Sequence, residues 1–269
     1  MLLTYLFYLA TALITNIMFY FTSPLEQFEV VNLISVSSPI LNINFSVTNL
    51  GLFTIIATAL LVLLHSQGMN NFNLVQSRIS LFIETIYSTV LNMVRGQIGD
   101  RNEIYLPFIY AIFTFILTAN LIGNVSYTFT VATSAVVGMG MSLLVWFGVT
   151  FLGLDRHRLH FFSFFVPQGC PLMLVPILSI IELISYLARA VSLGVRLIAN
   201  IVSGHALMII LAGFLYQGFS SGILISVVTL IPFTIFLAIV GLEIGVACIQ
   251  AYVFTILTAI YIKDSLDLH

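Results

Sequence analysis

The chain has 269 residues, of which 60% are hydrophobic and only 7% are charged. Soluble domains carry roughly 25% charged residues, so no water-soluble fold could bury this much apolar surface. The composition predicts a polytopic helical membrane protein, and the net charge of −2 with no basic stretch argues against nucleic-acid binding.

The first 22 residues are apolar, and the first Lys or Arg of the chain is Arg78. A secretory signal begins with positive charge and an organelle transit peptide is rich in Arg, so neither describes this start. We interpret the chain as inserted from the compartment in which it is made. Residues 1–22 are either a removable leader or an extra apolar segment, and residues 23–269 form a single membrane-embedded domain.

Three membrane spans are predicted before residue 160. Residues 49–65 form the first, and a polar loop at 66–73 follows it. In residues 74–98 apolar side chains recur at helical spacing between Arg78, Glu84, Asn92 and Arg95, which indicates an amphipathic helix on the membrane surface. Residues 106–122 and 131–154 form the second and third spans.

Two unusually long helices are predicted after the aromatic and proline-rich segment 161–176. They cover residues 176–213 and 232–261, about 57 Å and about 45 Å at 1.5 Å per residue, against a hydrocarbon core of about 30 Å. Such helices either break at Gly194 and Gly245 or tilt strongly, and tilt is favoured because apolar character continues through both glycines. The fold class is therefore all-α transmembrane, with about five membrane helices, one amphipathic surface helix, and a long, tilted final hairpin.

The short loops predict the orientation of the chain. Lys and Arg concentrate at 78–101, at 156–158 and at Lys263, whereas the turns at 123–130 and 216–222 have none. Basic loops stay on the side of synthesis, so we expect the C-terminus on that side.

The first long helix carries a stripe of polar residues. Glu182, Arg189 and Arg196 are spaced by seven residues, nearly two helical turns, and Asn200 continues the same face. Arg189 either takes part in function or simply neutralises Glu182. Arg196 is harder to explain structurally, because a cation at bilayer depth costs about 3 kcal/mol or more and its neighbours on this face cannot neutralise it. Its counter-charge must come from the other long helix or from another subunit.

The second long helix repeats the spacing, with Glu243 and Gln250 seven residues apart. Gly241 and Gly245 flank Glu243 as a small-residue pair that is typical of helix packing. Gln250 alone would more often be an interhelical hydrogen-bonding group than a functional one. Cys170 and Cys248 fit no metal spacing, and we predict neither a metal nor a cofactor.

The run ISYLARAVSLGVRLIANIVSGHALMIILAGF at 184–214 resembles the signature of subunit a of the F-type ATP synthases, in its mitochondrial and fungal forms. The segments NMVRGQIG at 92–99 and GLEIGVACIQAYVFTILTAIYIKD at 241–264 also resemble this family. The similarity covers most of the chain.

The resemblance implies roles for individual residues. It makes Arg196 the essential arginine that faces a rotating ring of c subunits. It assigns the proton path to Glu182, Asn200, His205, Glu243, Gln250 and Asp264. It also implies the mitochondrial inner membrane as the location, the matrix side for the C-terminus, and the peripheral stalk and other membrane-sector subunits as further partners.

The predicted topology agrees with two offset half-channels, because a proton crossing hydrocarbon needs titratable groups and water. His205 with Glu243 would line one half-channel and Glu182 with Asp264 the other, with Arg196 between them. The chain has no phosphate-binding GK[ST] loop, so we expect no enzyme activity from it alone. The alternatives are a secondary ion transporter, which usually shows an internal repeat that is not visible here, and a respiratory-complex membrane subunit, although only His205 lies inside a span.

Overall fold

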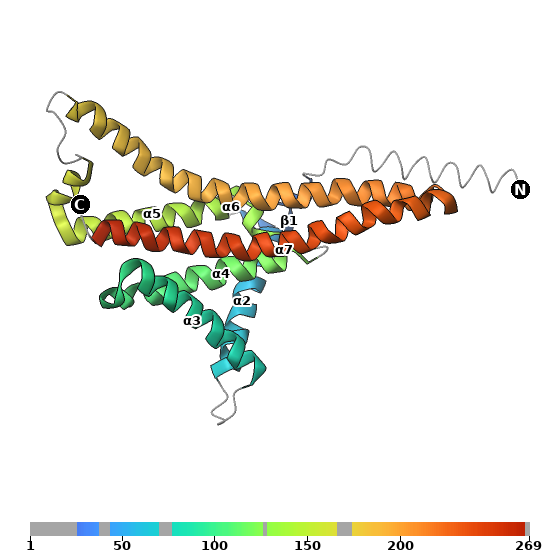
Figure 1. Ribbon diagram of the computed structural model, residues 1–269, viewed down its shortest axis with the longest axis horizontal. Coiled ribbons are helices and arrows are strands. Elements are labelled where there is room, and N and C mark those ends of the chain that lie inside the picture. Colours follow the sequence, from blue (N-terminus) through green and yellow to red (C-terminus); the bar gives the residue numbers. More distant parts are fainter. Residues whose placement is uncertain (1–25, 38–43, 70–76, 126–127, 166–173, 267–269) are drawn as a thin grey trace, which may run out of the picture.

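A computed structural model describes residues 26–37, 44–69, 77–125, 128–165 and 174–266 (Figure 1). The possible leader at 1–22, the second half of the predicted loop at 66–73, Cys170 and much of the proline-rich segment lie outside these residues. The described helices are α2 (Asn49–Met69), α3 (Arg78–Ile98), α4 (Leu106–Gly123), α5 (Ala135–His157), α6 (Val175–Ser220) and α7 (Ile223–Leu266). Short 3₁₀ turns are η1 (Glu26–Phe28), η2 (Asp100–Tyr105), η3 (Val131–Thr133) and η4 (Arg158–Phe165).

Five of the described helices are long and apolar enough to cross a membrane, namely α2, α4, α5, α6 and α7. The remaining helix, α3, is amphipathic and buries Val90, Met93, Val94 and Ile98 on one face. It begins at the N-cap Ser77, whose side chain accepts a hydrogen bond from the N–H of Ser80, and it ends at Gly99, whose φ is +88°. The predicted fold class is confirmed.

Both long helices are continuous through Gly194 and Gly245. Their 46 and 44 residues correspond to about 69 Å and about 66 Å, so they fit a bilayer only when steeply inclined. The predicted boundaries were too short. Pro232 lies inside α7 rather than at its start, and the turn between the helices shrinks to Ser221 and Gly222, whose φ is +124°. Apolar surroundings favour this outcome because every backbone group not bonded within a helix is costly in lipid.

Two other boundaries differ from the prediction. Ser66 to Met69 continue α2 instead of starting a loop, and the hydroxyl of Ser66 bonds back to the carbonyl of Leu63. The third span begins at Ala135 after the turn η3, and it runs to His157. Strands β1 (Asn32–Ser37) and β2 (Asn44–Thr48) form an antiparallel pair that no sequence pattern predicted.

The centre of the bundle is α7, which packs against α3, α4, α5 and α6. The buried cluster joins these elements through residues such as Ile109, Leu193, Leu197 and Phe254. The α6–α7 hairpin extends beyond α4 and α5 at the end where the two helices are connected, and the N-terminal part of α6 diverges from α7 at the opposite end (Figure 1). The end of α5 meets the end of α7, because Nε2 of His157 lies 3.1 Å from the carbonyl oxygen of Leu266. Two of the basic segments thus share one end of the bundle.

Candidate functional site

Arg196 lies on an exposed face of α6. Among the described residues, no carboxylate lies within ion-pair distance of its guanidinium. The preceding turn has Ser192 and the following turn has Asn200, and both are also exposed. This face of the hairpin therefore presents an uncompensated cation on a helix whose other exposed side chains are mostly apolar.

Asn200 links the Arg196 face to α7. Its Nδ2 donates a hydrogen bond of 2.8 Å to Oε1 of Gln250, which is 4% exposed. Thus the seven-residue spacing on each helix brings two predicted residues together across the hairpin.

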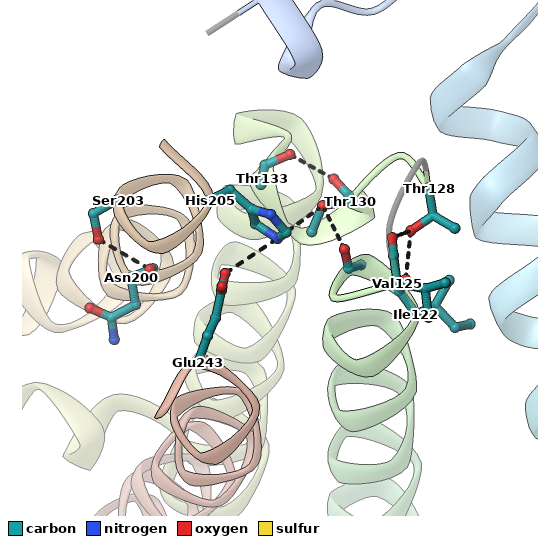
Figure 2. A network of polar contacts seen from close by, with 10 residues as sticks. Ile122, Val125, Thr128, Thr130, Thr133, Asn200, Ser203, His205 and Glu243 are labelled. Carbon is teal, nitrogen blue, oxygen red and sulfur yellow. Dashed lines mark hydrogen bonds and ion pairs between the residues drawn. The ribbon is translucent and has the colours of Figure 1, made fainter. Parts of the chain in front are cut away.

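His205 and Glu243 form a second pair across the hairpin (Figure 2). The Nε2 atom of His205 lies 3.5 Å from Oε1 of Glu243, and the two residues are 9% and 8% exposed. The hydroxyl of Thr130 lies 3.3 Å from the same Nε2 atom. Thr130 belongs to the connection between α4 and α5 and also donates to the carbonyl of Gly123. The imidazole therefore lies between a carboxylate and a hydroxyl contributed by different parts of the chain.

Apart from the 3.5 Å contact between Glu243 and His205, several buried polar atoms in and around this pair have no hydrogen-bond partner among the described protein groups. They are Oδ1 of Asn120, Nδ2 of Asn124, both carboxylate oxygens of Glu243, and Nε2 of Gln250. These four residues and Asn200 line a cavity of about 10 Å³, close to the minimum of roughly 10–15 Å³ that one water needs. Buried polar groups without protein partners usually bind water, so the cavity suits a water that bridges α4, α6 and α7.

Arg189 bridges the carboxylates of Glu182 and Asp264. The guanidinium of Arg189 lies 3.6 Å from Oε1 of Glu182 and 3.4 Å from Oδ2 of Asp264. About one third of each of these side chains is exposed. The same three-residue cluster joins α6 to the last turn of α7.

The structure therefore groups six of the seven predicted site residues into three pairs, and Arg196 lies between them along α6 without an ion-pair partner in the described ranges. Sequence reasoning missed Thr130, Asn120 and Asn124, and it left the role of Arg189 open. Asn120 and Asn124 are four residues apart at the end of a predicted span, and paired amides on one face of a membrane helix were the available signal. Within the described ranges, no group of three or more His, Cys, Asp and Glu side chains is placed to hold a metal ion.

These features define a class of membrane protein, one with polar and titratable side chains ordered along a long helical hairpin. The sequence model of the family described as ATP synthase A chain matches residues 51–263. This chain belongs to that family.

Individual relatives agree over nearly the whole chain. A protein of Mycosarcoma maydis named ATP synthase subunit a is 59% identical over 248 residues, which are 92% of this chain and 98% of the relative. Proteins with the same name from Podospora anserina and Neurospora crassa are 48% and 46% identical. Their alignments cover 93% and 97% of this chain, and 96% and 100% of the relatives.

Proposed function

We propose that this chain is the proton-translocating subunit of the membrane sector of an ATP synthase. Two offset half-channels pass protons to and from the carboxylates of a rotating c-ring, and this movement couples the proton gradient to ATP synthesis. The observation that carries the proposal is the exposed guanidinium of Arg196, which has no counter-charge among the described residues.

The first half-channel is formed by His205, Glu243 and the small polar cavity. The 3.5 Å contact between the imidazole and the carboxylate places two groups able to take up and release a proton side by side. The unpartnered amide and carboxylate atoms around the cavity would hold the water that continues the path to Gln250 and Asn200. From Asn200 the next residue on this face is Arg196, one helical turn away.

The second half-channel is formed by Glu182 and Asp264. Glu182 precedes Arg196 by fourteen residues, about 21 Å along α6, whereas His205 follows it by nine residues, about 13 Å. The two carboxylate-bearing clusters therefore lie on opposite sides of Arg196 along the helix. A proton cannot pass directly from one to the other and must be carried by a group that moves.

Arginine is suited to separate the two paths. Its guanidinium does not lose its proton in proteins, so it can attract an ionised carboxylate of the ring without relaying a proton itself. The driving energy is about 2.3 kcal/mol per charge for each 100 mV of membrane potential, in addition to the pH difference.

This function implies the partners and the location of the chain. The c-ring would face Arg196, and the peripheral stalk and other membrane-sector subunits would hold the chain in place. We assign the complex to the mitochondrial inner membrane, with the C-terminus on the matrix side, and the chemistry of ATP to partner subunits.

Cross-linking tests the proposal. Single cysteines at Ser192, Ala199 and Ser203, which are exposed on the Arg196 side of α6, are introduced after replacing Cys170 and Cys248 by Ser. Each should cross-link to a cysteine beside the ring carboxylate of a c subunit, whereas a cysteine at Val136, which is 76% exposed on α5, should not. Equal yields at both places, or none beside Arg196, would contradict the assignment, and the second result is expected of a secondary ion transporter.

A further inference from the structure

A second cavity lies apart from the polar site and is lined by residues of α2, α3 and α4, three helices that pack against one another (Figure 1). Its volume is about 260 Å³ and nearly all of its surface is apolar. Its lining includes Leu60 of α2, Phe82 of α3, and Leu121 at the end of α4. These side chains are 39%, 57% and 37% exposed, so the cavity opens onto the outer surface of the bundle.

The few polar groups in the lining are already satisfied within the chain. Nε2 of His65 lies 2.8 Å from the hydroxyl of Tyr110, and Nδ1 of His65 lies 2.9 Å from the carbonyl of Leu61. The hydroxyls of Thr114 and Thr118 donate to carbonyls of the preceding turn of α4. Because nothing in the wall needs a further hydrogen-bond partner, the occupant that the lining favours is apolar.

The dimensions indicate a chain-like occupant. A cavity of roughly 150 Å³ with an aliphatic and aromatic lining is enough to take up benzene, and this one is larger. Its lining on α4 runs from Tyr110 to Ile122, about 18 Å by helical rise, and one leaflet of the hydrocarbon core is about 15 Å deep. A partner helix, about 10 Å wide with its side chains, would need far more room.

Arg78 places a positive charge on the same face of α3 as Phe82, which lines the cavity. Arg78 is exposed, has no ion pair among the described residues, and lies one helical turn before Phe82. The first turn of α3 contains no acidic residue. An anionic headgroup held by Arg78 would leave its acyl chain at the rim formed by Phe82.

We propose that this cavity is a binding site for one acyl chain of an anionic phospholipid, whose phosphate pairs with Arg78. The site would anchor the first span and the amphipathic helix to α4 through a lipid. It lies outside the polar path and does not depend on proton transport.

Photolabelling of the intact complex in its membrane tests the site. The probes are phosphatidylglycerol with a diazirine in one acyl chain and the matching phosphatidylcholine. Phosphatidylglycerol should label cavity-lining peptides of α2, α3 and α4 several times more strongly than the exposed surface of α5 around Phe147 and Phe151. Equal labelling of both surfaces would overturn the proposal.

Two pairs of variants refine the test. Leu117→Trp fills the cavity and should lower the labelling severalfold, whereas Leu81→Trp, on an exposed part of α3 that does not line it, should not. Arg78→Gln should lower the preference for phosphatidylglycerol over phosphatidylcholine by about fivefold, as expected for one basic residue near an anionic headgroup, and Arg156→Gln should not.

If Leu117→Trp fails to assemble, the peptide map of the unaltered chain and Arg78→Gln decide the outcome. A photoreactive residue at Leu117 that captures a protein subunit instead of lipid would also overturn the proposal.

Discussion

Gly204 leaves room for the carboxylate of Glu243. A Cβ atom on Gly204 would lie 2.9 Å from Oε1 of Glu243, closer than real Cβ atoms come to other atoms, and 3.2 Å from Cδ, which is tighter than most such contacts. Gly204 directly precedes His205 in α6, so the absence of a side chain at this position lets the carboxylate approach the imidazole from α7 (Figure 2).

Gly204→Ala should therefore slow proton translocation while the complex still assembles. The atom that must move is the end of a flexible Glu side chain, so the carboxylate can shift at little cost in stability but loses its position beside His205. ATP-driven proton pumping in inverted membrane vesicles measures the effect, which we expect to be a severalfold loss of rate.

Gly245→Ala is the matched control, because a Cβ there meets nothing within 4 Å among the described atoms. It should leave the pumping rate close to that of the unaltered chain. Equal losses in the two variants would show that added side chains on the hairpin act through partners and not through Glu243.

Glu243→Gln tests the titratable group itself. The amide keeps the shape of the carboxylate but cannot take up a proton, so we expect pumping to fall by about a hundredfold, the lower end of the range for positioned acid–base groups. The pH profile of the remaining transport should also change. Glu84→Gln makes the same chemical change on an exposed face of α3 and should have no effect. An unchanged pH profile in Glu243→Gln would show that this carboxylate does not take up and release the transported protons.

The sequence predicted those parts of the site that follow from helical spacing along one segment. Glu182, Arg196, Glu243 and Gln250 could be assigned to helix faces because the spacing of seven residues is close to two turns. The length of the hairpin was underestimated because the sequence predicts Pro232 as the start of a helix. In water a proline inside a helix removes one backbone hydrogen bond, since it has no N–H, and usually breaks the helix. Membrane helices accommodate proline.

Contacts between distant segments were harder to predict. Asn120 lies 127 residues before Ala247, whose carbonyl its Nδ2 reaches at 3.4 Å, and no local pattern relates the two. Thr130 reaches His205 only because the connection between α4 and α5 folds against α6. The pairing of β1 with β2 likewise depends on register across a connection rather than on spacing within a segment.

Arg189 holds two carboxylates from different helices, so its removal should affect both. In Arg189→Gln, Glu182 and Asp264 would lose the cation within 3.6 Å and 3.4 Å, and we expect a severalfold lower pumping rate. Arg189→Lys should recover only part of it, because one ammonium group cannot reproduce the two-sided geometry of a guanidinium. Full activity in Arg189→Gln, with normal assembly, would show that the cluster is only structural.

Arg196→Ala should have the most severe effect of these substitutions. Arg189 is neutralised within the chain by Glu182 and Asp264, whereas Arg196 has no described partner and so should contribute little to the fold of the isolated subunit. We expect normal assembly of the complex, with ATP-driven pumping lost to background.

Arg156→Ala serves as the control, because this exposed arginine lies in the last turn of α5 and not on α6 or α7. Normal pumping in Arg196→Ala would refute the proposed role directly. Loss of assembly would also count against it, because it would mean that the guanidinium stabilises the fold or a static interface. If a fixed cation separates two half-channels, its removal would let protons pass without turning the ring. Arg196→Ala should therefore lose coupled pumping and show increased passive proton leakage.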